Sequence, residues 1–120
     1  MKLRLNEKSI RFRVRRSEVA VFSEASAIST AAPFPGGREL VFRLSAASVD
    51  KLSVSFEDDS IEVRVPSAAA EQWCNSDEVG IYGQDGTLEI MVEKDFRRTS
   101  APSPDDEDRY PNPRASGGRR

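Results

Sequence analysis

The chain of 120 residues contains no histidine and a single cysteine, Cys74. The absence of histidine removes the commonest general base and metal ligand of enzymes. One cysteine cannot form an intramolecular disulfide bond, so a disulfide-stabilised secreted scaffold is excluded. No histidine is present to activate Cys74, and we expect it to be a small buried residue. No carboxylate pair stands out for acid–base chemistry, so we predict no catalytic residue and no cofactor, and an enzyme is the less favoured hypothesis.

Long apolar segments are also missing. No stretch approaches the roughly 20 apolar residues that a membrane-spanning helix needs. The first 16 residues, MKLRLNEKSIRFRVRR, carry charges throughout and lack the apolar run of a signal peptide. We therefore expect a cytoplasmic protein with no membrane contact.

Hydrophobic residues are scarce after position 96. Residues 97–120 contain only Ala101, Tyr110 and Ala115 of the hydrophobic set and are rich in proline and charge. Such a segment buries too little apolar surface to offset the entropy of ordering it, so we expect a largely disordered tail. Residues 1–96 suffice for one domain with a modest core.

Within residues 1–96 the main signal is alternation of apolar and polar residues, which is typical of strands with one buried face. The alternating apolar sets are Leu3 and Leu5; Ile10, Phe12 and Val14; Leu40, Phe42 and Leu44; Leu52, Val54 and Phe56; Ile61, Val63 and Val65; and Leu88, Ile90 and Val92. Half-polar strands of this kind favour antiparallel sheets. Residues 57–60 and the pair Asp85 and Gly86 predict hairpin turns, and the second turn predicts residues 79–82 as a partner strand.

Two short helices are predicted between the strands. Ser17 is an expected N-cap for residues 18–25, and Ser67 for residues 68–74. Neither helix then has a complete capping box, because position N3 is alanine in both. Residues 33–37, PFPGG, predict a loop that cannot continue a strand. The order is then β-β-α-β-β-β-β-α-β-β, an α+β domain with a twisted, mainly antiparallel sheet of about six to eight strands. No internal repeat is apparent.

The segments MKLRLNEKSIRFRV followed by SEV, FEDDSIEVRVP, SDEVG, LEIMVEKDF and YPNP resemble, in this order, a family of small uncharacterised bacterial proteins. The resemblance extends to Pro113, although residues 97–108 depart from the family pattern and ASGGRR matches nothing in it. It implies a cytoplasmic bacterial protein with a domain of unknown function. No catalytic residue or ligand is implied by it.

The net charge of −2 is unevenly distributed. Residues 1–16 hold seven basic residues and one acidic residue, whereas residues 17–96 hold five basic and fifteen acidic residues. Arg11, Arg13 and Arg15 alternate along one strand face. We favour cross-strand pairing with Glu62, Glu89 or Glu39, and the alternative is an anion site formed by the three arginines and Arg64. Nucleic acid is disfavoured because the chain is acidic overall and lacks aromatics interleaved with the basic residues.

A more specific form of the anion-site hypothesis is a charged tunnel. The segment at residues 88–94 is similar to the acidic-lysine strand of triphosphate-processing tunnel enzymes. If the sheet curled with its charged face inside, Arg11, Arg13 and Arg64 would bind phosphates while Glu89 and Glu93 would hold a metal ion. The chain is short for such a tunnel. The acidic runs at residues 57–59 and 105–108 lack the spacing of a calcium loop, and we interpret both as solvated.

The tail contains one motif suited to docking, Tyr110, Pro111, Asn112 and Pro113. Two prolines favour an extended segment of low entropy after an aromatic anchor, which docks in grooves of its own domain or of a partner. Our leading hypothesis is a non-catalytic accessory or binding protein that acts through another protein. The alternative is a phosphate- or nucleotide-binding protein, and the third hypothesis is a homodimer through an unpaired sheet edge.

Overall fold

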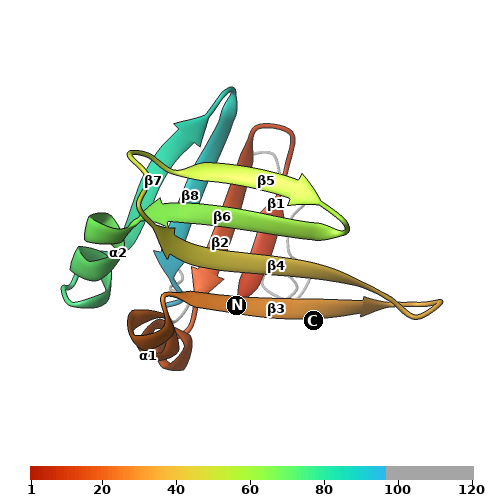
Figure 1. Cartoon of the computed structure of the whole chain (residues 1–120), viewed down its shortest axis with the longest axis horizontal. Coiled ribbons are helices and arrows are strands. Elements are labelled where there is room, and N and C mark those ends of the chain that lie inside the picture. Colours follow the sequence, from red (N-terminus) through yellow and green to blue (C-terminus); the bar gives the residue numbers. More distant parts are fainter. Residues whose placement is uncertain (97–120) are drawn as a thin grey trace, which may run out of the picture.

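The computed structural model describes residues 1–96, which form eight strands and two helices (Figure 1). Their bounds are β1 (Lys2–Leu5), β2 (Ser9–Val14), α1 (Arg16–Ala25), β3 (Ala27–Phe34), β4 (Arg38–Ala47), β5 (Ser53–Glu57), β6 (Ser60–Pro66), α2 (Ser67–Cys74), β7 (Gly80–Asp85) and β8 (Leu88–Lys94). The α+β class, the element order and the strand number predicted from the sequence are confirmed.

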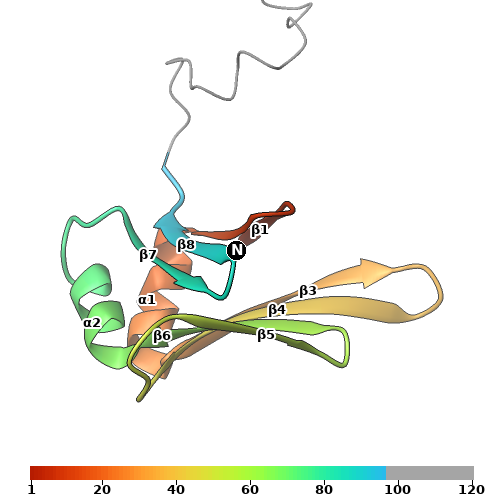
Figure 2. The same cartoon turned by 90° about the horizontal axis from the view of Figure 1, so that it is seen from above.

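The strands form two four-stranded sheets that pack face to face. Sheet A has the order β1-β2-β8-β7 and sheet B the order β3-β4-β6-β5. Figure 1 shows the strands of sheet B in front of those of sheet A and crossing them steeply, with both helices at one end of the molecule. Figure 2 shows that sheet B continues beyond sheet A on the side away from the helices.

The alternating residues build the core between the sheets. Ile10, Phe12 and Val14 of β2 are at most 1% exposed, so the arginines between them face away from the core. On sheet B, Val63 and Val65 of β6 are fully buried. Phe12 contacts Phe42 across the interface, with ring centroids 6.0 Å apart. The period-two prediction is confirmed at these positions.

The prediction of one sheet needs a correction. The central pairs β2–β8 and β4–β6 are parallel, and four antiparallel pairs complete the two sheets. Alternation indicates which face of a strand is buried, but it does not indicate which other strand pairs with it. The chain therefore buries two apolar faces against each other, and a single sheet covered by helices is not needed.

Both helices begin earlier than predicted. The N-cap of α1 is Arg15, and the Glu18 carboxylate accepts a hydrogen bond from the Arg15 backbone N–H at 2.9 Å. This is the carboxylate half of a capping box, which the choice of Ser17 as N-cap had concealed. The N-cap of α2 is Pro66, one residue before the predicted Ser67.

Pro33 lies inside β3, contrary to the prediction that residues 33–37 form only a loop. Within residues 1–96, β3 pairs with β4 on one side only and is an edge strand. An edge strand can accommodate proline, because the missing N–H can face away from the neighbouring strand. The turn itself is short, and Gly36 and Gly37 adopt positive φ angles of 88° and 79° there.

The fold contains an internal repeat, contrary to the expectation of none. Each half has the order ββαββ, and exchanging β1-β2-α1-β3-β4 with β5-β6-α2-β7-β8 converts the strand order of sheet A into that of sheet B, which is a pseudo-twofold topology. Ser9 maps onto Ser60 and Phe22 onto Trp73 with the same shift along the chain. The Glu89 N–H donates to Lys8 O at 2.9 Å, and the equivalent Val41 N–H donates to Asp59 O at 3.0 Å. The local signal is the shared pattern Ser-Ile-x-x-Arg-Val in SIRFRV and SIEVRV.

Candidate functional site

The outer face of sheet A, which we call the basic face, is built by alternation and strand register. Because Ile10, Phe12 and Val14 point inward, Arg11 and Arg13 point outward. In the antiparallel β1–β2 pair, Arg4 lies opposite Arg11 and Lys2 lies opposite Arg13. Four cations therefore form two adjacent cross-strand pairs on one surface.

The same face continues onto β8 and β7. Met91 lies beside Arg11 in the parallel β2–β8 pair, and Tyr82 lies beside Met91. One row across all four strands thus reads Arg4, Arg11, Met91, Tyr82. Tyr82 is 55% exposed, so the row combines charge with accessible aromatic surface.

Glu93 joins the two halves of the basic face. Its Oε1 lies 3.3 Å from Arg11 Nε, and its Oε2 accepts a hydrogen bond of 2.9 Å from the Tyr82 hydroxyl. The Arg11 Nε–H is not directed at the carboxylate and makes no hydrogen bond within residues 1–96, so the contact is an ion pair without one. Burial raises the pKa of Tyr82, and the hydrogen bond to Glu93 raises it further, so its hydroxyl stays protonated at neutral pH.

The positive charges of the other cations on the basic face are less fully neutralised by acidic side chains. Lys2 Nζ lies 3.1 Å from Asp95 Oδ2, while the Lys2 side chain remains 71% exposed. Arg4 and Arg13 are exposed, and neither has an ion pair within the described part of the chain. Three acids, Glu89, Glu93 and Asp95, stand against the four cations, so the face carries a small net positive charge in a protein of net charge −2.

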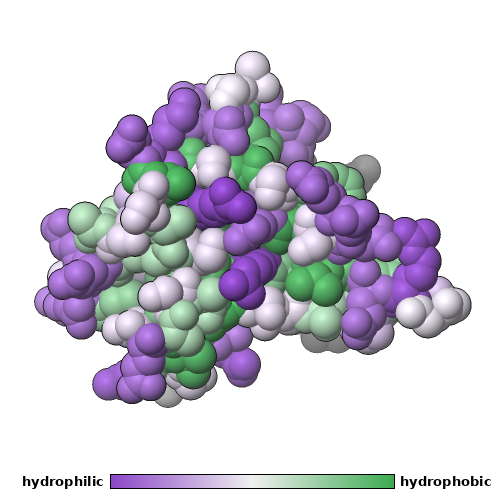
Figure 3. Space-filling model, in the orientation of Figure 1, coloured by the Kyte–Doolittle hydropathy of each residue, from purple (hydrophilic) through white to green (hydrophobic). Residues whose placement is uncertain are grey.

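The repeat supplies an internal comparison, because the outer face of sheet B occupies equivalent positions. Ser53 and Ser55 stand where sheet A has Lys2 and Arg4, and Glu62 stands where it has Arg11. Glu62 lies 3.5 Å from Arg43 and 3.9 Å from Arg64, and it accepts a hydrogen bond from the Ser45 hydroxyl at 2.8 Å. Figure 3 shows this face with hydrophilic residues near its middle and paler residues between them. Both arginines of this face, Arg43 and Arg64, are thus paired with Glu62.

The structure separates the arginines of the predicted anion site. Arg11 and Arg13 share the basic face, but Arg64 lies on the outer face of the other sheet. Arg15 is the N-cap of α1, and its Nε lies 3.5 Å from Glu18.

The ion pairing predicted for the arginine face occurs with different acids. Arg11 pairs with Glu93, whereas Glu62 and Glu39 belong to sheet B and cannot reach the basic face. The charged faces of both sheets point outward and the apolar faces meet between them, so residues 1–96 form no charged tunnel.

Glu89 and Glu93, the predicted metal pair, lie on the same face of β8 with Met91 between them. Residues four apart along a strand are separated by roughly 13 Å, which is too far for one ion. No group of three His, Cys, Asp or Glu residues within positions 1–96 is arranged to hold a metal. In the same region no helix is long and apolar enough to span a membrane.

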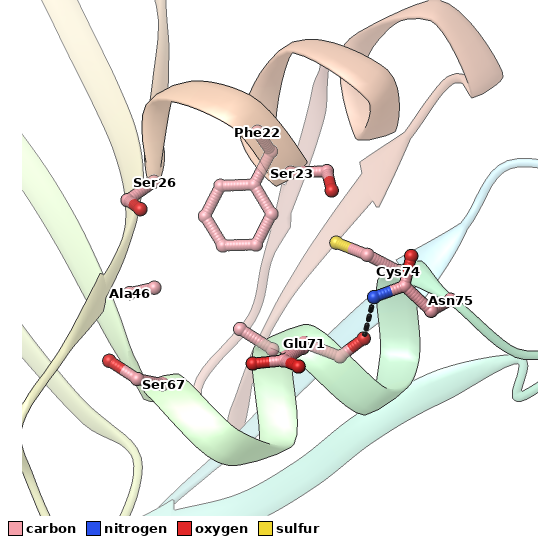
Figure 4. A pocket seen from close by; sticks show the side chains of 9 residues that line it. Phe22, Ser23, Ser26, Ala46, Ser67, Glu71, Cys74 and Asn75 are labelled. Carbon is pink, nitrogen blue, oxygen red and sulfur yellow. Dashed lines mark hydrogen bonds between the residues drawn. The ribbon is translucent and has the colours of Figure 1, made fainter.

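A cavity of about 330 Å³ lies between the helices, and Phe22 and Cys74 point into it (Figure 4). Ser23, Ser67 and Glu71 also line it, and the Asn75 amide donates to Glu71 O at 2.9 Å. Burial raises the pKa of the Cys74 thiol, against smaller opposing effects of Lys94 and Ser23. The thiol is therefore protonated at neutral pH and poorly nucleophilic. We do not assign catalysis to this cavity.

Sequence reasoning found Arg11 and Arg13 but missed the other members of the basic face. Lys2 and Arg4 become neighbours of the arginines only through the β1–β2 register, and Met91 and Tyr82 only through pairing with β8 and β7. The alternation of KLRL was the available signal for β1. The predicted docking motif, from Tyr110 to Pro113, and the acidic run at 105–108 lie outside the described residues.

The fold and its site define an α+β sandwich of two similar halves, with one basic outer face and one outer face whose arginines are ion-paired. The chain belongs to the family of unknown function DUF7009, whose sequence profile matches residues 1–114. The family resemblance seen in the sequence is thereby confirmed. No significant match was found among curated proteins or among solved structures.

Proposed function

We propose that the protein is a non-catalytic accessory module that binds an acidic segment of another protein on the basic face. The main support for this proposal is the contrast between the outer faces of the two sheets. Equivalent positions hold Lys2, Arg4 and Arg11 on sheet A and Ser53, Ser55 and Glu62 on sheet B. A structural role for the charges would be satisfied by the paired arrangement of sheet B, whereas sheet A keeps Arg4 and Arg13 available.

The chemistry of the basic face favours a polypeptide ligand. Met91 and Tyr82 offer apolar contact in line with Arg4 and Arg11, and Tyr, Met and Arg are the residues enriched at protein interfaces. Glu89 and Glu93 on the same face repel a densely charged phosphate ligand. A peptide with separated carboxylates and apolar side chains matches this mixture better than a polyphosphate does.

The test uses a pair of charge reversals that the repeat makes equivalent. Arg13 and Arg64 occupy the same repeat position on β2 and β6, and both are exposed. Full-length chains carrying Arg13→Glu or Arg64→Glu serve as baits in a native lysate beside the unmodified chain. We expect a protein retained by the unmodified chain and by Arg64→Glu, with retention reduced about tenfold or more by Arg13→Glu.

Two outcomes would contradict the proposal. Equal retention by both variants would show that the basic face is not the binding surface. If neither the unmodified chain nor either variant retains a protein, the proposal of a protein partner is wrong. Thermal denaturation of the same chains with ATP, tripolyphosphate and Mg²⁺ addresses the phosphate alternative. A ligand at a hundredfold excess over its Kd adds about 2.7 kcal/mol of stability, so a clear rise in Tm abolished by Arg13→Glu would favour that alternative.

A further inference from the structure

The apolar inner face of sheet B is incompletely covered away from the helices. Phe34 of β3 is 55% exposed and Phe56 of β5 is 69% exposed, although both lie on the face that forms the core elsewhere. Figure 2 shows why: the β3–β4 hairpin extends well past β1 of sheet A. Exposed apolar residues that share a face often mark an interaction site.

A shallow cavity of about 370 Å³ lies at the end of this hairpin, and we call it the overhang. It is lined by Phe34, Pro35, Arg38, Glu39, Leu40 and Asp59. Arg38 makes two hydrogen bonds of 2.6 Å to the Asp59 carboxylate, which joins the β3–β4 hairpin to the β5–β6 turn. The overhang therefore has an apolar floor with a charged rim.

We propose that the overhang is the docking site for this chain's own segment Tyr110, Pro111, Asn112 and Pro113. The tyrosine ring would cover Phe34 and Leu40, and the prolines would hold the segment extended with little loss of entropy. This surface lies on the other sheet from the basic face, so the inference is independent of the proposed function.

The length of the chain permits this contact. Strand β8 ends at Lys94, and the 16 residues from there to Tyr110 span up to roughly 50 Å when extended. Strand β4, which runs from the overhang toward the helical end, has 10 residues and is roughly 33 Å long. The family match also continues past the last strand and ends at residue 114, immediately after Pro113. The motif is thus inside the family's shared sequence.

The two arginines that flank the motif complement the acidic residues of the overhang. Glu39 and Asp59 line the overhang, and Asp58 adjoins them in the β5–β6 turn, while Arg38 is already paired with Asp59. The motif is flanked on both sides by arginine, in the sequence RYPNPR at residues 109–114, and the acidic run at residues 105–108 comes directly before Arg109. Arg109 and Arg114 can therefore contact an acidic rim while Tyr110 occupies its apolar floor.

Photo-crosslinking of the full-length chain identifies what covers the overhang. Phe34 is replaced by p-benzoylphenylalanine, which keeps the aromatic ring, and the irradiated products are sized and mapped by mass spectrometry. We expect a monomer with an internal cross-link between position 34 and a peptide containing Tyr110. A cross-linked dimer would show that a second copy covers the overhang, and absence of any cross-link would show that nothing does; either result overturns the proposal.

Two variants sharpen the result. Tyr110→Ala should reduce the internal cross-link about fivefold or more, because one aromatic anchor carries a large share of such a contact. The same photo-reactive residue at Val21, which is 54% exposed on α1 at the opposite end of the molecule, should give no link to Tyr110. An equal cross-link in Tyr110→Ala, or an equal yield from position 21, would show a random collision and overturn the assignment.

Discussion

At the scale of single residues, two equivalent aromatics close the helical end of the core. Phe22 of α1 and Trp73 of α2 occupy the same repeat position, are at most 2% exposed and pack edge to face at 6.2 Å. The Trp73 indole N–H donates to Val79 O at 3.1 Å, so its polar atom is satisfied. The amphipathic character of both helices was visible in the sequence, but their mutual contact was not, because it depends on the pseudo-twofold arrangement.

Shortening one member of this pair should be costly. Phe22→Ala leaves a cavity beside Trp73, and we expect a loss of about 3–5 kcal/mol in the free energy of unfolding. Trp73 is the single tryptophan of the chain, so its fluorescence during urea denaturation reports the change. The neighbouring Val21→Ala, at a position 54% exposed, is the matched control and should cost less than about 1 kcal/mol. Similar losses in both variants would contradict the assignment of Phe22 to the core.

Glu18 links the start of α1 to the start of the chain. Its carboxylate contacts the Met1 ammonium and accepts the Arg15 backbone N–H at 2.9 Å. Burial alone would raise the pKa of Glu18, but the ammonium and Arg15 together outweigh it and lower the pKa below its usual 4.5. The folded pKa is thus depressed relative to the unfolded one. The resulting stabilisation is fully present above pH 4.5 and is lost as the pH falls through the folded pKa.

The variant Glu18→Gln should therefore be less stable at pH 7 by about 1 kcal/mol, the typical value of a charged group at a helix N-terminus. The difference from the unmodified chain should shrink as the pH is lowered below 4.5. Thermal melts between pH 7 and pH 3 measure it. Glu24→Gln, which removes an exposed carboxylate from the last turn of the same helix, controls for net charge and should not lower the stability at pH 7. A stability gap that persists at pH 3 would refute the ionic explanation.

At the scale of elements, local patterns predicted most strands and their buried faces. Ile10, Phe12 and Val14 could be placed in the core because alternation is a property of one strand. The parallel neighbours of β2 and β6 could not be predicted, because they are not adjacent in the sequence and the alternation within a strand does not identify its partner. Pro33 also misled the prediction, since its compatibility with β3 depends on that strand being an edge.

Strand β7 offers a test of element packing. A Cβ atom at Gly80 would lie 2.7 Å from Val92 O and 2.8 Å from the Tyr82 hydroxyl, closer than such atoms approach. Gly80→Ala must therefore push β7 from β8 or displace Tyr82 from Glu93, and we expect a loss of roughly 1–3 kcal/mol. At Gly83 in the same strand, the nearest atom to a new Cβ is Leu52 at 3.4 Å, an ordinary contact. Urea denaturation should thus show Gly83→Ala to be much less destabilising, and a reversed order would refute the packing of this edge.

At the scale of the whole molecule, the repeat halves are interlocked. Both parallel pairs, β2–β8 and β4–β6, join a strand of one half to a strand of the other. The fully buried residues Val14 and Leu44 belong to the first half, whereas Val63 and Ile90 belong to the second. Each half alone provides two hairpins and one helix but no complete sheet, and an isolated hairpin is marginally stable in water. The two halves are therefore expected to fold as one unit.

Division of the chain between the halves tests this arrangement. The cut falls after β4, in the connection that leads to β5, and gives fragments 1–47 and 48–120. We expect neither fragment to show a cooperative thermal transition by circular dichroism, because each lacks the strands that flank its own central strands. Mixing them at equal concentration should restore sheet structure and shift the Trp73 emission to the blue as that side chain is buried against Phe22. Fragment 1–47 carrying Phe22→Ala should bind fragment 48–120 more weakly, because the contact between Phe22 and Trp73 is lost. A fragment that unfolds cooperatively by itself would show that the halves are independent, and the parallel pairs would then contribute little to the stability of the domain.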